Sequence, residues 1–217
     1  MMFLIRLMYL GSDPLLTCGA VISGLHEAMT PLSIVAGAMM LFETMESMNC
    51  MPYMMREMKV LTKGHPIAEL MILFNFAYMV EGASGFGTPA ALGAPMLVSL
   101  GHPKFESVVC LLLMNTFATV WGAVGTPIWF GFGELGLTEE DLLTISSQAG
   151  ICLTVATFIL MPMILTIIVP ARVVMKNFLF ILLSLGSCMF PVLGLSFVSY
   201  EFPALIGGMI GKSLNLL

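Results

Sequence analysis

Near the middle of the chain stands the run EGASGFGTP, residues 81–89, which interrupts an apolar segment extending from residue 67 to residue 101. A second run, GAVGTP at residues 122–127, divides the apolar segment 105–136 in the same way. A glycine costs about 1 kcal/mol and a proline about 3 kcal/mol in a helix interior, so each run predicts a helix break. Each segment is also longer than the roughly 20 residues that one straight helix needs to cross a bilayer.

The composition identifies lipid as the solvent for most of the chain. Of the 217 residues, 59% are hydrophobic and 10% are charged, whereas about a quarter of the residues in an ordinary soluble domain are charged. The apolar segments cover residues 15–42, 67–101, 105–136, 142–169 and 177–199, and a partial one covers 203–217. We therefore expect an all-α, multi-pass integral membrane protein in which no soluble linker or second domain separates the apolar segments.

Charge and residue spacing argue against several functional classes. The net charge is −5 and only eight Lys and Arg residues are spread over the chain, whereas nucleic-acid binding needs clustered basic side chains. The five cysteines and three histidines lack the spacing of metal ligands, so we expect neither a metal site nor another cofactor. No cluster of acid, base and nucleophile indicates an enzyme.

The positions of the basic residues predict the topology. Lys and Arg lie within residues 56–63, at Lys104 and within residues 172–176, and such residues collect in cytoplasmic loops. If all three places are cytoplasmic, the segments between them cross the membrane an even number of times. The segment 67–101 is then a re-entrant hairpin, and 105–136 is a broken crossing. Charged residues alternate with Met over residues 43–66, which is typical of an amphipathic surface helix.

Two helix breaks at membrane depth predict a binding site. Unwound backbone is tolerated there only where protein or a water-filled cavity satisfies it, and interrupted helices mark the substrate sites of many transporters. Thr88 and Thr126 each precede a proline, so we expect them to cap two half-helices whose N-termini share one anion. Glu81 follows a long apolar run, which indicates proton coupling or substrate-site electrostatics; a structural cap at the hairpin tip is the alternative.

The candidate substrate and proton site contains ten residues. They are Glu81, Gly82, Ser84, Gly85, Gly87, Thr88, Asn115, Thr116, Gly125 and Thr126. For Asn115 and Thr116, contact with substrate or ion and hydrogen bonding between helices are both open. Near the C-terminal end, the run GGMIGKS at residues 207–213 looks like a phosphate-binding loop but has Ile206 where that motif needs glycine. We expect its small residues to allow close helix packing instead.

These motifs together resemble the L-lactate permease family. The family pattern E-G-A-(A/S)-G-F-G-x-P matches residues 81–89, and L-G-(F)-x-P, N-T and F-G-A-x-G-x-P match residues 100–103, 115–116 and 121–127. The family's G-A-x-x-L helix resembles residues 37–41. His102 and Trp121 stand where the family usually has Phe. These departures leave open the preference among lactate, glycolate and related acids.

The resemblance implies a proton-coupled symporter of the cell membrane for lactate and similar 2-hydroxy monocarboxylates, and it implies that residues 1–217 form a single, incomplete transporter domain. It also implies a bundle of two inverted repeats, of which this chain, less than half as long as family members, would form one half. The alternatives are a truncated remnant without transport activity and a passive anion channel lined by the re-entrant loops. The expected partners are lactate, protons and the lipid bilayer. The oligomeric state stays open, with a homodimer among the options.

Overall fold

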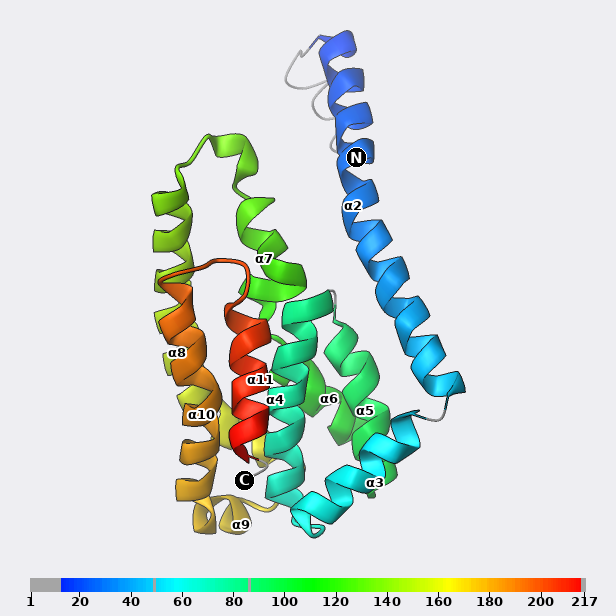
Figure 1. Ribbon diagram of the computed structural model, residues 1–217, viewed down its shortest axis with the longest axis vertical. Coiled ribbons are helices and arrows are strands. Elements are labelled where there is room, and N and C mark those ends of the chain that lie inside the picture. The colour runs from blue at the N-terminus through cyan, green and yellow to red at the C-terminus, as the bar shows by residue number, and fades with distance from the viewer. Residues whose placement is uncertain (1–12, 49, 86, 216–217) are drawn as a thin grey trace. The chain divides into compact units, whose positions relative to one another are not determined.

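The computed structural model describes residues 13–48, 50–85 and 87–215, which lie in helices and in the connections between them (Figure 1). Within these residues there is no β-strand, so the all-α prediction is confirmed. The chain divides into two compact units, residues 1–41 and residues 42–217. All of the features that bear on function below lie in the second unit.

The described part of the first unit is occupied almost entirely by one long helix that continues beyond the unit. This helix, α2 (Pro14–Ser47), has 34 residues and is therefore about 51 Å long. It contains the predicted apolar segment 15–42 but is not among the helices that are both long and apolar enough to cross a membrane. It also includes residues 43–47, so the amphipathic segment expected from residue 43 begins later, at the helix α3.

The second unit is a bundle of helices joined by short connections. Its elements are α3 (Cys50–Thr62), α4 (Pro66–Ser84), α5 (Thr88–Leu100), α6 (Lys104–Asn115), η1 (Thr119–Trp121), α7 (Gly122–Trp129), η2 (Gly133–Leu135), α8 (Glu139–Leu165), α9 (Ala171–Lys176), α10 (Phe178–Ser196) and α11 (Pro203–Asn215).

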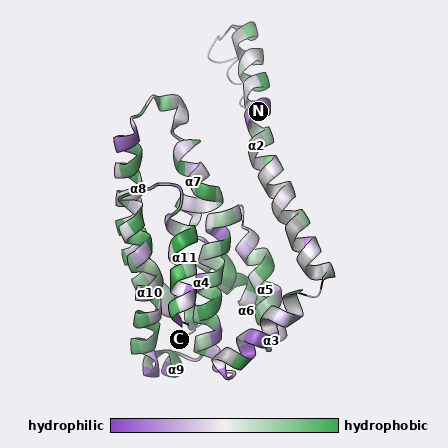
Figure 2. Cartoon of the chain, in the orientation of Figure 1, coloured by the Kyte–Doolittle hydropathy of each residue, from purple (hydrophilic) through white to green (hydrophobic). Residues whose placement is uncertain are grey.

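Three of these helices, α4, α8 and α10, are long and apolar enough to span a bilayer. A bent pair, residues 104–115 with residues 119–129, makes a fourth span if it is counted as one, and its bend is 63°. The helix break predicted within residues 105–136 is therefore present as this bend, and the crossing of the membrane by the pair stays a prediction. Hydrophobic residues cover α8 and α10 (Figure 2), and side chains such as Ile159 and Leu183 are more than 60% exposed. Such surfaces suit lipid as solvent.

Helices α4 and α5 form an antiparallel hairpin. The imidazole Nε2 of His102, just after α5, lies 3.1 Å from a carboxylate oxygen of Glu69 in the first turn of α4. Lys59 Nζ donates to the backbone oxygen of Ser99, near the end of α5, over 3.5 Å. The end of α5 therefore returns to the beginning of α4, as the predicted hairpin requires. Re-entry from one membrane side stays a prediction, because α4 alone has the length of a span.

Helix α11 packs closely against both α4 and α10. A Cβ atom on Gly208 would lie 2.8 Å from Cα of Met79, and one on Gly211 would lie 2.7 Å from Cβ of Cys188. Neither position has room for a side chain, so the three helices approach each other to backbone contact. The run at residues 207–213 is thus a packing face, as its small residues indicate.

Candidate functional site

Three parts of the chain, each at a helix end or a helix break, meet in one region. A Cβ atom on Gly85 would lie 2.9 Å from the backbone nitrogen of Ala123, and one on Gly125 would lie 2.8 Å from Cα of Glu201. A Cβ atom on Gly82 would lie 2.8 Å from Cα of Leu205. The backbone around Gly82 and Gly85, around residues 122–125 and around residues 200–205 is therefore in contact. We call the described residues 81–85, 87–88, 122–126 and 197–205 the junction. It joins both predicted helix breaks to the connection between α10 and α11.

The second break contains a left-handed turn. Ala123, Val124 and Gly125 have φ values of +46°, +57° and +72°. A left-handed conformation costs a residue with a side chain roughly 1–2 kcal/mol, and it persists only where the surrounding structure holds it. Here the tip of the α4–α5 hairpin lies on one side of the turn and the α10–α11 connection lies on the other. The junction therefore stabilises the turn.

Side chains satisfy the carbonyl groups that the second break removes from helical hydrogen bonding. The donations are from Tyr78 Oη to Phe117 (2.7 Å), from Thr119 Oγ1 to Thr116 (3.0 Å), from Thr126 Oγ1 to Ala123 and from Trp129 Nε1 to Val124 (3.3 Å). A buried carbonyl without a partner would cost about 1–3 kcal/mol. The break is thus compatible with membrane depth, because protein groups replace the absent helical donors.

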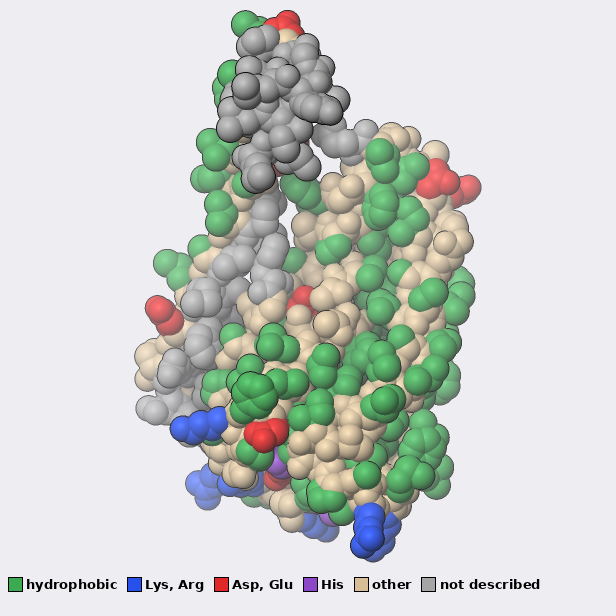
Figure 3. All heavy atoms as spheres, turned by 180° about the vertical axis from the view of Figure 1, so that it is seen from behind, with side chains coloured by type: hydrophobic (Ala, Val, Ile, Leu, Met, Phe, Trp, Pro, Cys, Tyr) green, Lys and Arg blue, Asp and Glu red, His purple; other side chains and the backbone are tan. Residues whose placement is uncertain are grey.

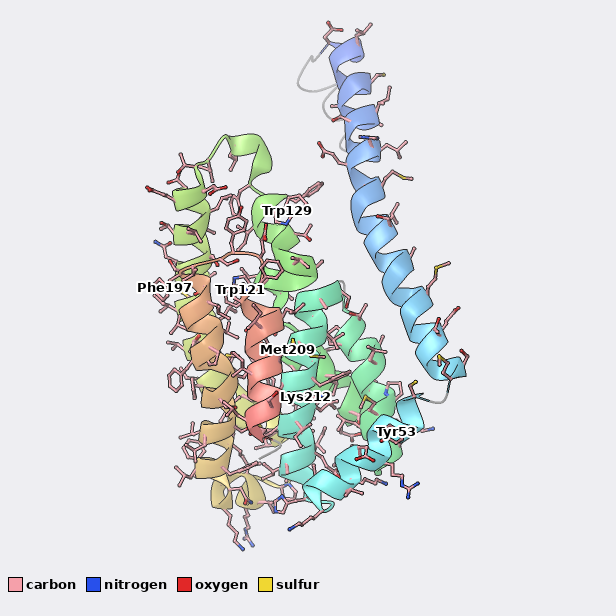
Figure 4. All side chains as sticks on the ribbon, in the orientation of Figure 1. Tyr53, Trp121, Trp129, Phe197, Met209 and Lys212 are labelled. Atoms are coloured by element: carbon pink, nitrogen blue, oxygen red, sulfur yellow. The ribbon has the colours of Figure 1, made fainter. Side chains whose placement is uncertain are left out.

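Trp121 anchors this break to α8. Its side chain is fully buried, and its indole Nε1 donates to Ser146 Oγ over 2.9 Å. Figure 4 shows Trp121 near the beginning of α7 and Trp129 farther along that helix. The indole N–H needs a hydrogen-bond partner when it is buried, and the Ser146 hydroxyl accepts this hydrogen bond. A phenylalanine at position 121 would have no such donor and would need no partner.

The expected capping roles of Thr88 and Thr126 are wrong. Gly87, with φ of +77°, occupies the N-cap position of α5, and Thr88 is the first helical residue. The Thr88 hydroxyl donates back to the carbonyl of Gly85 over 3.0 Å and also contacts the Ser84 hydroxyl. Thr126 donates back to Ala123 in the same way. Both hydroxyls serve carbonyls freed by the breaks, because the left-handed residues before them have already turned the chain.

Glu81 is the acid at the centre of the junction. Its side chain is 3% exposed, and a Cβ atom on Gly122 would lie 2.9 Å from its Oε1. Its Oε2 has no hydrogen-bond partner among the described residues, although the Gly87 backbone amide interacts with the carboxyl group. Glu81 also lies in the last turn of α4, where the helix dipole disfavours negative charge. This carboxyl group therefore needs a proton or a further polar partner.

Eight of the ten predicted site residues lie in the junction. The exceptions are Asn115 and Thr116, at the end of α6. Thr116 is exposed and its hydroxyl donates to Leu113 within its own helix, whereas Asn115 Oδ1 is buried without a partner among the described residues. Sequence reasoning missed Tyr200 and Glu201. The sequence could have indicated them, because polar residues interrupt the apolar segments just before Pro203. A proline at the beginning of a helix also follows the two breaks that were recognised.

A comparison with known families assigns the chain. A model of the family described as L-lactate permease matches residues 1–216. The chain belongs to the L-lactate permease family. Relatives in this family are named permeases, and the structure of this chain has several apolar helices able to span a membrane.

Curated relatives agree with this family. The permease sequence is 38% identical over 213 residues to a putative L-lactate permease of Haemophilus influenzae, covering 98% of this chain and 40% of the relative. It is 36% identical over 83 residues to the L-lactate permease of Bacillus subtilis, covering 38% and 15% of the two chains. With the L-lactate permease of Escherichia coli K12 it shares 28% identity over 151 residues, 69% and 27% of the two chains. No solved structure matches the permease chain.

The relatives are considerably longer than this chain. The permease chain spans about 40% of the length of the Haemophilus influenzae relative and less of the other two. The junction lies within the matched part, since its residues fall between 81 and 205.

Proposed function

We propose that this chain contributes a substrate site to a carrier that moves L-lactate and related 2-hydroxy monocarboxylates across the cell membrane together with a proton. Family membership supports the substrate, because the matched relatives are named L-lactate permeases. The structure supports the location, because the family motifs at residues 81–89 and 121–127 are in contact at the junction.

The substrate carboxylate is suited to the beginning of α5. The helix dipole favours an anion at the beginning of a helix. The amides of Thr88 and Ala90 already donate to the carbonyls of Gly85 and Gly87, so in the proposal the attraction comes from the dipole and from nearby hydroxyl groups. α5 begins at Thr88, in the junction, and its N-cap makes no side-chain hydrogen bond. The hydroxyl groups of Ser84 and Thr88 lie beside this end. They are short side chains that could exchange their mutual contact for one with the 2-hydroxyl group of the substrate.

The observation that carries the proton proposal is the partnerless carboxylate oxygen of Glu81. Moving one negative charge inward against the membrane potential costs about 2.3 kcal/mol per 100 mV. A co-transported proton makes the movement of lactate electroneutral. Glu81 is buried beside the proposed anion site, so in the proposal it takes the proton while the substrate carboxylate occupies the beginning of α5. Two adjacent negative charges would otherwise repel each other there.

The test is Glu81→Gln in the full-length protein. Glutamine has nearly the same shape but cannot carry a proton. We expect the variant to lose lactate accumulation driven by an imposed proton gradient and to retain lactate exchange, in which no net proton movement occurs. Glu69→Gln is the matched control, because Glu69 is a buried acid of the same helix that pairs with His102 outside the junction. Proton-driven accumulation by Glu81→Gln would refute the role of Glu81.

A further inference from the structure

Helix α3 carries an exposed stripe in which apolar and basic side chains alternate. Tyr53, Arg56 and Val60 follow each other at spacings of three and four residues, which places them along one side of the helix. Lys63, with φ of +52°, follows just beyond the end of the helix at Thr62. All four are exposed, and Tyr53 and Val60 are each 66% exposed. We call these four residues, together with Lys59, the α3 stripe.

No carboxylate in the described part of the chain forms an ion pair with the cations of the α3 stripe. The only ion pair among the described residues joins His102 and Glu69, so no described carboxylate pairs with Arg56 or Lys63. Lys59 donates to the carbonyl of Ser99 over 3.5 Å, which ties α3 to the end of α5 and keeps the stripe in place. Glu57 is the one described acidic residue in α3 itself. The stripe therefore presents net positive charge.

The stripe lies at the end of the bundle where the other basic residues gather. Lys104 begins α6, and Arg172 and Lys176 lie on α9, at the same end as α3 (Figure 1). Figure 3 shows Lys and Arg side chains together at this end of the molecule. The acids Glu139 and Glu140 begin α8 at the opposite end. Since the helices between the two ends expose apolar side chains, we expect α3 to lie at the level of the lipid headgroups.

We propose that the α3 stripe binds the headgroups of anionic phospholipids. Long basic side chains can place their charge at the phosphate while their stems cover apolar surface, and tyrosine favours the same boundary. Tyr53 and Val60 then enter the edge of the hydrocarbon, and Arg56 and Lys63 contact phosphates. Because Lys59 and the Thr62–Glu69 contact join α3 to the base of the α4–α5 hairpin, bound lipid holds that base at the membrane surface. This role does not depend on the proposed lactate site.

The test uses the full chain in a neutral detergent with two added lipids, dioleoylphosphatidylglycerol and dioleoylphosphatidylcholine. Native mass spectrometry measures how much of each lipid stays bound. Each basic side chain near an anionic surface is worth about a five-fold preference. We expect the variant R56Q/K59Q/K63Q to lose at least ten-fold of its preference for the anionic lipid. The matched control R172Q/K176Q removes charge from the same end but outside the α3 stripe, and should change the preference clearly less than the α3 variant does.

A second variant separates lipid from a simple ion site and from misfolding. Y53S/V60S keeps every charge, so we expect weaker retention of both lipids with an unchanged ratio between them. Circular dichroism should show the same helix content for all variants. Equal losses in the α3 and α9 variants would overturn the proposal, as would an unchanged preference in R56Q/K59Q/K63Q. Displacement of the anionic lipid by millimolar inorganic phosphate would also overturn it, in favour of a site for free anions.

Discussion

Both helix breaks contain glycine-rich sequence, yet they are built differently. The first lies around Gly85 and Gly87, and the second covers residues 116–125. In the first, Gly85 and Gly87 take positive φ values, which cost glycine little. In the second, Ala123 and Val124 also take positive φ values, which side chains oppose. The first break can therefore hold its shape with little help, whereas the second depends on hydrogen bonds and backbone contacts from α4 and the α10–α11 connection.

This difference indicates that the backbone strain lies in the second break, which α4 and the α10–α11 connection hold in place. Strained residues persist where the surrounding structure over-determines them, and they cluster at functional sites. If the account is right, changes that remove the support of the second break should be far more damaging than matched changes at the first.

The largest expected effect is that of Gly125→Ala. A Cβ atom there would lie 2.8 Å from Cα of Glu201, on a backbone with φ of +72°. Because a backbone atom cannot move as a flexible side chain does, we expect a loss of about 3 kcal/mol or more in the free energy of unfolding. Unfolding in detergent micelles measures it. Gly87→Ala is the control: it has φ of +77° but no neighbouring atom within 4 Å, and should cost about 1 kcal/mol. Equal losses would contradict the comparison.

A middle-sized effect is expected for Tyr78→Phe. The change removes only the hydroxyl that donates to the carbonyl of Phe117 over 2.7 Å, in a side chain that is 1% exposed. A buried carbonyl without a donor should cost about 1–3 kcal/mol of folding free energy. Thr116→Val removes a hydroxyl that is exposed and donates within its own helix, so it should change stability by less than about 0.5 kcal/mol. If both variants behave alike, Tyr78 does not support the break.

The smallest expected effect is a stabilisation, whereas most substitutions destabilise a protein. Ala123→Gly should stabilise the protein by up to about 1 kcal/mol, because relief of the left-handed strain exceeds the extra entropy that glycine loses on folding. Ala118→Gly is the matched control: Ala118 is similarly buried but has φ of −107°. There the same change should destabilise by roughly 1 kcal/mol. Thermal unfolding of the two variants compares the signs, and destabilisation by both would show that residue 123 is unstrained.

Much of the fold followed from the sequence because glycine and proline interrupt helices for local reasons. The runs at residues 81–89 and 122–127 marked both breaks, and the basic residues around 67–101 indicated a hairpin whose two ends the structure brings together. The glycines at 207, 208 and 211 indicated close packing, which the contacts with α4 and α10 confirm.

Other features depended on contacts that no local pattern encodes. The roles of Thr88 and Thr126 were misjudged because a hydroxyl before proline can serve either an amide or a carbonyl, and the left-handed residues before it decide which. The place of Tyr200 and Glu201 depends on the folding of α11 back along α4, which brings distant residues to Gly125. The continuation of α2 through residue 47 was missed because charged residues do not by themselves end a helix.

The central claim is that both breaks line one site for lactate, and chemical protection tests it most directly. Single cysteines at Ser84 and at Val124, both partly exposed, are introduced into a cysteine-free form of the full-length protein in membranes. The rate of N-ethylmaleimide labelling is then measured against L-lactate concentration, with a cysteine at the distant, exposed Glu140 as control. We predict protection of both junction cysteines with the same half-maximal lactate concentration, and none at position 140. Protection of one junction cysteine without the other, or at a different lactate concentration, would contradict a shared site.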